Sequence, residues 1–330
     1  MMKSIKNSFL IAISFLFIFT LFSYSPKAML DVNIKEDSSN TKTLPKNFRK
    51  TSDLSSIENI NYLNLEGLDT LNISGSEQFT EFNLPLLKEN INNDFNIVDI
   101  DLREESHGFI NGFAISFANS NNSANKGLTY NEVINKENED LSSIKIGESL
   151  IFYNNNKEII PKVVQNEEEV TKAKNLSYFR IPVTDGELPN EDMVNRFVSF
   201  VSELPENTWL HFHCKAGIGR TTTFMIMYDI MKNYDNASLD DIIARQVLLA
   251  NLNPKESIDF FMERRYTFLN DFYNKCKNDK SINTSSNSII SANNLISTNN
   301  SSYIKNSKVQ IVNPENFMRL IERNVPHIDA

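Results

Sequence analysis

Residues 208–223, TWLHFHCKAGIGRTTT, constrain the fold of this 330-residue chain more than any other stretch. Apolar residues up to Phe212 predict a short buried strand, and residues 221–232 place apolar side chains at helical spacing. A loop joins the two, with Cys214 at its start and Arg220 at its end. The stretch therefore predicts a strand, a tight loop and a helix N-terminus, with a thiol and a guanidinium at the two ends of the loop.

This loop has the properties of an anion-binding site. A helix N-terminus presents unpaired N–H groups and about half a positive charge. Gly217 and Gly219 allow positive φ angles, so that the loop amides turn inward, and the planar fork of Arg220 holds two anion oxygens. We therefore expect the residues between the thiol and the guanidinium to bind a phosphate-like oxyanion: Lys215, Ala216, Gly217, Ile218 and Gly219.

The same positive field makes Cys214 a candidate nucleophile, because it stabilises the thiolate and lowers the pKa of the thiol. We expect His213 to help maintain this environment and the Thr221 hydroxyl to donate to the sulfur when it leaves. A cysteine after a buried strand is by itself usually a small core residue. The combination of His, Cys and Arg-Thr at this spacing favours catalysis instead.

Residues 213–221 resemble the signature of the cysteine-dependent phosphatases, the protein tyrosine phosphatase superfamily. Other strings resemble one subgroup, the bacterial PTP-like inositol phosphatases or cysteine phytases: residues 44–49, 101–109, 178–185, 209–214 and 222–225. The resemblance spans residues 43–275. It implies an α/β fold, with a phosphatase core made of a central mixed sheet flanked by helices and a small partial β-barrel inserted over residues 110–175.

A phosphatase also needs an acid that protonates the leaving oxygen. The turn after a predicted strand offers Asp185, which its position alone does not separate from Glu187, Glu191 and Asp192. The resemblance assigns the general acid to Asp185.

Two further substrate contacts are predicted outside the loop. Arg49 lies in one of the matching strings. Gln246 stands where a glutamine of the superfamily helps to place the hydrolytic water, although a helix-surface amide is the simpler interpretation. Two positions depart from the family pattern. Gly186 replaces a histidine that often contacts substrate phosphates, and Lys215 replaces an acidic residue of some members.

The resemblance implies metal-independent hydrolysis of phosphate monoesters through a cysteinyl-phosphate intermediate, with inositol polyphosphates as the substrate. Two alternatives stay open: a tyrosine or dual-specificity protein phosphatase, and a non-catalytic module that binds phospholigands. The expected partner is accordingly a phosphorylated small molecule or a phosphoprotein.

The ends of the chain differ in composition from its body. Residues 1–28 have the lysines, apolar run and length of a secretory signal peptide, with an uncleaved membrane anchor as the competing interpretation. A polar linker is predicted over 29–42, the phosphatase domain over 43–277, and a low-complexity linker over 278–306. Residues 307–330 predict a terminal helix that docks on the body. We expect export, and membrane contact only through the leader.

Charge and cysteine content exclude several classes of function. The net charge of −9 becomes −12 without the three lysines of residues 1–28, which argues against a nucleic-acid partner. Two cysteines form no disulfide framework, and we interpret Cys276 as structural. We expect neither a metal nor another cofactor, since no zinc-ligand spacing connects the four histidines: His107, His211, His213 and His327.

Periodicity predicts the remaining elements of the body. Strands are expected at 96–102 and 177–183, a hairpin at 149–153 and 158–164, and helices at 82–90, 167–175, from 190, 239–252 and 254–275. The charged stretch 103–108 is expected to be a surface loop, either salt-linked or facing the substrate.

Overall fold

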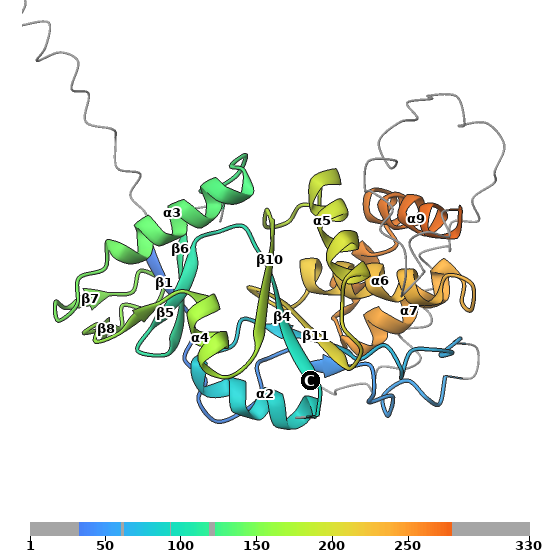
Figure 1. Cartoon of the computed structure of the whole chain (residues 1–330), viewed down its shortest axis with the longest axis horizontal. Helices are drawn as coiled ribbons and strands as arrows, with labels where there is room; N and C mark the ends of the chain where they lie inside the picture. The colour runs from blue at the N-terminus through green and yellow to red at the C-terminus, as the bar shows by residue number, and fades with distance from the viewer. Residues whose placement is uncertain (1–32, 61–62, 93, 119–122, 279–330) are drawn as a thin grey trace, which may run out of the picture.

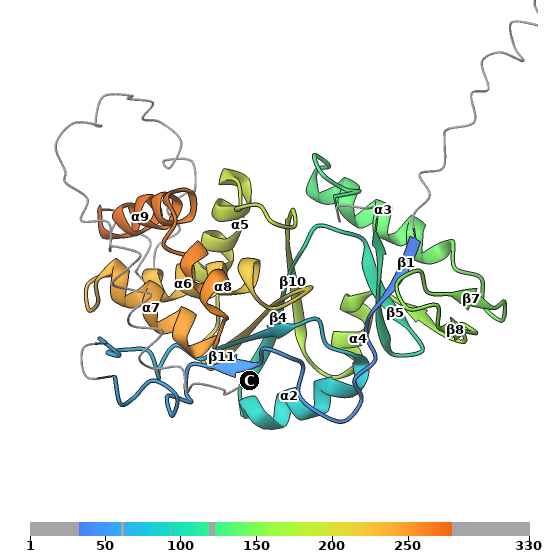
Figure 2. The same cartoon turned by 180° about the vertical axis from the view of Figure 1, so that it is seen from behind.

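The structure, a computed structural model, describes residues 33–60, 63–92, 94–118 and 123–278. A central sheet lies between helices, and a smaller sheet stands beside it with helix α3 (Tyr130–Ser142) along its edge (Figure 1). The view from behind shows strand β1 (Asn33–Ser38) running along the smaller sheet (Figure 2). The predicted α/β class, a central mixed sheet flanked by helices, is confirmed.

Five strands form the central sheet in the order β10-β4-β11-β3-β2. Four of them are parallel, and β2 pairs antiparallel with β3 at the edge. Their bounds are β2 Arg49–Lys50, β3 Ile73–Glu77, β4 Asn96–Arg103, β10 Ser177–Val183 and β11 Thr208–Cys214. The carboxyl ends of parallel strands meet at one edge of a sheet, so the segments after these four strands come together there.

Helices from the C-terminal half cover one face of this sheet: α5 Glu191–Ser202, α6 Gly219–Asn233, α7 Leu239–Leu249, α8 Pro254–Asp259 and α9 Glu263–Asn278. Helix α6 is the centre of the layer, because every residue except Gly219 and Lys232 is buried. Its predicted apolar stripe packs with Phe212 of β11 and Phe197 of α5. The loop before α6 therefore starts from two rigid elements.

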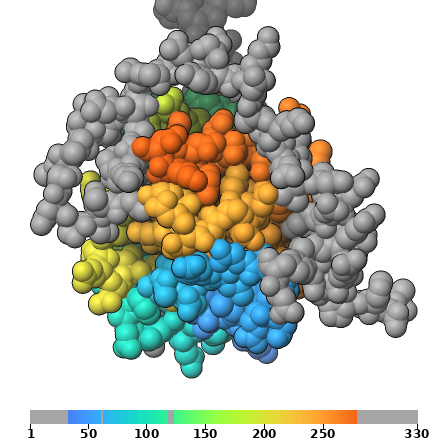
Figure 3. Space-filling model, turned by 90° about the vertical axis from the view of Figure 1, so that its right-hand side faces the viewer, coloured from blue at the N-terminus to red at the C-terminus, as the bar shows by residue number. Residues whose placement is uncertain are grey.

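The C-terminal helices also pack on the segment between β2 and β3. Figure 3 shows the gold part of the chain directly against this segment (blue), with the orange helix α9 on the far side of the gold part. Arg245 of α7 holds the contact, since it donates to the carbonyl oxygens of Asn64 and Glu66 and pairs with Asp229 of α6.

Two shorter helices cover the other face of the central sheet: α2 Leu84–Ile91, which follows the 3-10 turn η1 Glu81–Asn83, and α4 Glu167–Ala173. Leu84 and Leu87 of α2 pack with Trp209 of β11 and Val170 of α4. The side chains of β11 thus alternate between two cores, as a strand requires.

The smaller sheet is antiparallel, in the order β1-β6-β5-β9, and a separate hairpin joins β7 and β8. The bounds are β5 His107–Ile110, β6 Phe113–Ala118, β7 Leu150–Ile151, β8 Glu158–Ile159 and β9 Val164–Gln165. Phe117 and Phe152 pack with Leu141 of α3 in a core of their own. The partial β-barrel over residues 110–175 stays a prediction, since this sheet also takes β1 and β5 from outside that range.

Strand β1 corrects one predicted boundary. It lies inside the predicted linker 29–42, yet it pairs along its length with β6. Its sequence, NIKEDS, has a single apolar residue, Ile34, so the strand carries no apolar alternation that predicts it. Backbone pairing and the charged partners of Glu36 and Asp37 hold it instead.

Two other predictions about the ends need comment. The predicted helix 254–275 is divided into α8 and α9, with the break at residues 260–262. The leader 1–28, the terminal helix 307–330 and all but the first residue of the linker 278–306 lie outside the described residues. Across the part of the chain that the structure describes, no helix has the length and hydropathy to cross a bilayer.

Candidate active site

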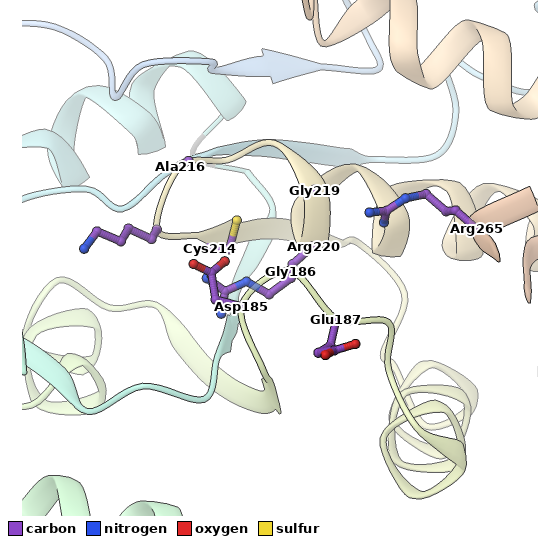
Figure 4. A pocket seen from close by; sticks show the side chains of 9 residues that line it. Asp185, Gly186, Glu187, Cys214, Ala216, Gly219, Arg220 and Arg265 are labelled. Atoms are coloured by element: carbon purple, nitrogen blue, oxygen red, sulfur yellow. The ribbon is translucent and has the colours of Figure 1, made fainter. Parts of the chain in front are cut away.

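A cavity of about 170 Å³ opens where β10 and β11 end and α6 begins. Six of the residues that line it are predicted from the sequence: Asp185, Cys214, Lys215, Ala216, Gly219 and Arg220. Figure 4 shows Cys214, Asp185 and Arg220 grouped together, with Glu187 and Arg265 farther along the same cavity. Arg265 comes from α9, and Gly186 comes from the turn directly after β10.

The loop after Cys214 turns its carbonyl groups away from the cavity. Three successive carbonyl oxygens accept hydrogen bonds from outside the loop: Lys215 from the backbone of Gln78 (3.2 Å), Ala216 from Asn47 (2.8 Å) and Gly217 from Arg49 (2.6 Å). The C=O and N–H of a trans peptide point in opposite directions. The next amide after each carbonyl therefore faces inward, and the loop presents a concave set of donors.

Gly217 is required by its surroundings. Its φ is +72°, and a Cβ there would lie 2.3 Å from the Ser76 carbonyl carbon and the Glu77 amide nitrogen of β3. Gly219 differs from the prediction, because it is the first residue of α6 and its nearest neighbour, Arg265, leaves room for a Cβ at 3.9 Å. The tight passage of the loop past β3 thus depends on a single glycine.

Cys214 is buried at the base of this concave loop. The backbone amides of Gly217 and Thr221 donate to its sulfur, and the Thr221 hydroxyl lies 3.2 Å from Sγ. Burial alone would raise the pKa of the thiol, but the positive charge of Arg220 and these hydrogen bonds lower it below its ordinary value. The predicted contact between Thr221 and the sulfur is present.

Arg220 is held in place by carboxylates and carbonyls. Its two terminal nitrogens donate to Glu105 at 2.8 and 3.1 Å, and Nη1 also donates to the Val183 carbonyl oxygen at 2.9 Å. Burial disfavours the guanidinium, but Glu105 and the thiolate of Cys214 raise its pKa further above an already high value. The fork is therefore permanently charged and fixed toward the loop.

Asp185 lies beside Cys214 and Arg220 at the end of β10 (Figure 4). Its Oδ1 is 3.1 Å from Nη2 of Arg220, and its side chain is 41% exposed. A turn directly after β10 positions it, with Gly186 at a φ of +74° and the Glu187 amide bonded to the Thr184 carbonyl. Among the candidate acids after β10, Asp185 contacts the loop arginine, as the resemblance implies.

The stretch 103–108 is not a surface loop, because all six residues are buried. It lies next to the loop that follows Cys214, because the Glu105 carboxylate accepts hydrogen bonds from both Arg220 and Arg103. The pKa of Glu105 is held well below its ordinary value, because the two guanidiniums outweigh the cost of burial. Neither predicted alternative, salt-linked surface or substrate-facing loop, describes it. The one signal in the sequence was the density of opposite charges itself.

A chain of buried charges continues from Glu105 to the other end of the loop. Arg103 Nη2 lies 2.9 Å from Asp37 Oδ2, and Asp37 Oδ1 lies 3.0 Å from Lys215 Nζ. Burial would raise the pKa of Asp37, but Arg103 and Lys215 lower it. Arg220 and Lys215, five residues apart on the loop, are thus also connected through strand β1.

His213 lies on the face of β11 opposite to Cys214, since neighbouring residues of a strand point to opposite sides. Its Nε2 is 2.6 Å from Glu167 Oε1 of α4 and 3.6 Å from Asp99 Oδ1. The expectation that His213 helps to maintain the environment of the thiolate stays a prediction, and the ring itself contacts Glu167 and Asp99. Through these contacts the histidine connects the end of β11 to α4 and β4.

The same side contains two groups of side chains with metal-ligand chemistry: Asp99, Glu167 and His213, and Asp101, His107 and Glu167. Sequence spacing gave no such pattern, because the residues come from four separate elements. Burial and the Glu167 carboxylate raise the pKa of Asp99 well above its ordinary value.

Arg49 and Gln246, both predicted to bind substrate, have other partners. Arg49 is buried behind the loop, where it donates to Gly217 O and, at 2.9 Å, to the Thr222 hydroxyl, and burial lowers its pKa to about 10. Gln246 is neither near the cavity nor on a helix surface. It is buried in α7 and donates to Asp229 at 2.9 Å. Eight of the eleven residues of α7 are buried, and Gln246 is one of them.

Comparison with known proteins agrees with this geometry. The sequence model of PTP-like phytases, described as "Inositol hexakisphosphate", matches residues 100–232. A solved PTP-like myo-inositol phosphatase from Mitsuokella multacida, in complex with myo-inositol-(1,3,4,5)-tetrakisphosphate, superposes with a TM-score of 0.68 at 32% identity. That match covers 78% of this chain and 47% of the other. The part of the chain that contains Asp185, Cys214 and Arg220 thus matches the PTP-like phytase family.

A second structure of the family, a PTP-like phytase from Bdellovibrio bacteriovorus, superposes with a TM-score of 0.63 at 29% identity and covers 77% of this chain and 92% of that one. Effector protein hopD2 of Pseudomonas syringae pv. tomato is 30% identical over 255 residues, 71% of this chain and 54% of its own length. The chain spans about half the length of the curated relatives it matches.

The family match begins within β4 and ends within α6. It therefore contains Asp185, Cys214 and Arg220 but leaves out two side chains at the rim of the site. Asp37 comes from β1, before the match, and Arg265 from α9, after it.

Proposed function

We propose that the protein hydrolyses phosphate monoesters through a cysteinyl-phosphate intermediate. One observation carries the proposal. A buried thiol with a lowered pKa lies at the base of a loop whose amides face the same cavity as the Arg220 guanidinium and the Asp185 carboxyl. Such a site binds a tetrahedral dianion directly in line with a nucleophile.

The first step is attack of the Cys214 thiolate on phosphorus. The S–P bond forms as the ester P–O bond breaks, and Asp185 gives its proton to the leaving oxygen. The inward amides and Arg220 hold the charge on the three other oxygens. In the second step Asp185, now a carboxylate, takes a proton from water, whose oxygen bonds to phosphorus while the S–P bond breaks. The Thr221 hydroxyl, 3.2 Å from the sulfur, stabilises the departing thiolate.

We propose inositol polyphosphates as the substrates. One feature of the structure supports this class beyond the family match. The cavity continues past the phosphate loop to Arg265, whose side chain is 13% exposed and hydrogen-bonds Thr223 of α6. A second phosphate on a ring substrate would meet this guanidinium while the first is held by the loop.

The test compares phosphate release from inositol hexakisphosphate and from a phosphotyrosine peptide, each with and without EDTA. We expect faster release from inositol hexakisphosphate and no effect of EDTA. A preference for the peptide would indicate a tyrosine phosphatase instead. Binding of either ligand without turnover would indicate a module that only binds phospholigands.

A pair of cysteine variants controls this test. Cys214→Ser should abolish turnover and retain phosphate binding, because the amides and Arg220 stay in place. Cys276→Ala removes the other cysteine, which is buried in α9, and should retain turnover. Wild-type rates in the Cys214 variant would contradict the mechanism.

We also propose that the protein is exported, with residues 1–28 as the leader and the membrane contacted only through it. The apolar run after Lys3 and Lys6 supports this. Fractionation of producing cells with an antibody to the body tests it, and retention of full-length protein in the cytoplasm would contradict it.

A further inference from the structure

The ammonium of Lys215 is already occupied by a carboxylate. Lys215 lines the cavity and directly follows the nucleophile, and its side chain is 27% exposed. Its Nζ lies 3.0 Å from Oδ1 of Asp37, a side chain that is only 2% exposed. The Ser116 hydroxyl donates to the same oxygen of Asp37 at 2.9 Å and lies 3.4 Å from Nζ.

Asp37 is itself fixed from the opposite side. Its second oxygen, Oδ2, accepts a hydrogen bond of 2.9 Å from Arg103, which is fully buried and also donates to Glu105. The carboxylate therefore stays where it is when a ligand enters the cavity, because leaving would abandon a buried guanidinium. The Lys215 ammonium is bound to a rigid partner.

We propose that Asp37 is a specificity-determining residue: it holds the Lys215 ammonium against β1 and cancels the charge that Lys215 would otherwise offer to a second phosphate group. This rests on the proposed phosphatase function. The cavity then discriminates among phosphorylated ligands through Arg265 at its other end, whose own partner Asp259 is 58% exposed, while the wall formed by Lys215 is electrically neutral. Removal of the Asp37 carboxylate frees the Lys215 ammonium, which then forms a cationic subsite for multiply phosphorylated ligands.

The experiment measures inhibition of p-nitrophenyl phosphate hydrolysis by two ligands, inositol hexakisphosphate and inorganic phosphate. In Asp37→Asn, the released ammonium should lower the inhibition constant of inositol hexakisphosphate about three- to tenfold, whereas that of inorganic phosphate should change less than about twofold. Inhibition is measured whether or not inositol hexakisphosphate is turned over. A failure of the proposed substrate class is thus seen separately from a failure of this inference.

Two further variants isolate the cause. In Lys215→Met, adding Asp37→Asn should leave the ratio of the two inhibition constants unchanged, because the ammonium that it releases is absent. Glu36→Gln removes the neighbouring carboxylate of β1, which pairs with Lys157 on the smaller sheet, and should keep the wild-type ratio. Equal shifts for both ligands, or a shift that persists without Lys215, would overturn the inference.

Loss of Asp37 also deprives Arg103 of a partner, so circular dichroism must establish that the variant folds. A measurement on the unaltered protein covers the case in which it does not. The ammonium resonance of Lys215, assigned by its disappearance in Lys215→Met, should move no more with saturating inositol hexakisphosphate than with inorganic phosphate. A larger response to inositol hexakisphosphate would mean that Lys215 leaves Asp37 for a phosphate, which contradicts the proposal.

Discussion

Glu105 and Arg220, 115 residues apart in the chain, meet through two parallel hydrogen bonds of 2.8 and 3.1 Å. Both side chains are buried, so the carboxylate sets the direction of the guanidinium in the proposed phosphate site. This pairing connects the end of β4 to the start of α6. It makes a residue outside the Cys-x5-Arg signature part of the phosphate site.

Glu105→Gln should therefore impair both activity and stability. The amide keeps the shape of the side chain, but its NH2 group faces one nitrogen of Arg220. The negative charge that Glu105 shares between the buried guanidiniums of Arg103 and Arg220 is also lost. We expect kcat/KM to fall about 100-fold and the free energy of unfolding to fall by about 3 kcal/mol. The matched control is Glu168→Gln, which breaks an exposed pair with Lys172 and should cost less than about 0.5 kcal/mol. Equal behaviour of the two variants would contradict the positioning role.

Alkylation of Cys214 by iodoacetamide should persist well below the pH at which an ordinary thiol stops reacting. The thiolate is the reactive form and its pKa is lowered, so the rate falls only when the pH drops through that lowered value. Thr221→Val removes the hydroxyl that donates to the sulfur and should move the profile about one pH unit upward. Thr171→Val, at another buried helical threonine, should leave the profile in place. An unshifted profile in the Thr221 variant would show that the hydroxyl does not lower the pKa of Cys214.

The stability of the protein should decrease from neutral to alkaline pH because of His107. Burial would lower the pKa of His107, but Asp101 and Glu137 outweigh Arg180 and the burial and raise it to about 10, with Glu167 a further 3.3 Å neighbour. A raised pKa means that the protonated form stabilises the fold. This contribution is complete below about pH 6.5 and is lost as the pH rises toward 10.

His107→Gln should thus be less stable than the wild type near neutral pH, and the difference should shrink as the pH rises, by about 4 kcal/mol at most. Urea unfolding of both proteins across this range measures it. His211→Gln is the control, because burial lowers the pKa of His211 and keeps this ring neutral throughout the range. A constant difference between the His107 variant and the wild type would show that its charge does not stabilise the fold.

Gly217→Ala should distort the phosphate loop. The new Cβ would meet the backbone of Ser76 and Glu77 at 2.3 Å, and φ is positive. We expect a fall in kcat of at least about tenfold and a loss of about 2 kcal/mol or more in the free energy of unfolding. Gly147→Ala is the matched control: its φ is also positive, at +83°, but nothing lies within 4 Å of the added Cβ. It should cost about 1 kcal/mol and retain kcat.

The catalytic loop could be predicted from the sequence because its chemistry is local. Cys214, Arg220 and Thr221 are close in the chain, and a strand followed by a helix fixes their relation. Asp185 needed the family resemblance, since four carboxyls follow β10 and only the fold selects one. The helix capped by Asn190 is confirmed, because capping is also a local interaction.

Long-range partners were not predictable in the same way. Glu105 was assigned to a surface loop because charged residues are rarely buried. The sequence around it does not indicate Arg220 as its partner. Strand β1 was missed because its own side chains carry no alternation, so its pairing with β6 depends on a sheet that other segments build. Gln246 was misplaced because the motif of a family locates a residue in the sequence but not the face of the helix on which it lies.

The outward carbonyls of residues 215, 216 and 217 have a consequence for which substitutions the loop can accept. In the proposed mechanism main-chain N–H groups bind the first phosphate, and every amino acid except proline has such a group. A substitution of the Lys215 or Ala216 side chain therefore leaves the inward amides in place. New preferences for the rest of the substrate can be acquired there by single substitutions, while positions 214, 217 and 220 stay fixed.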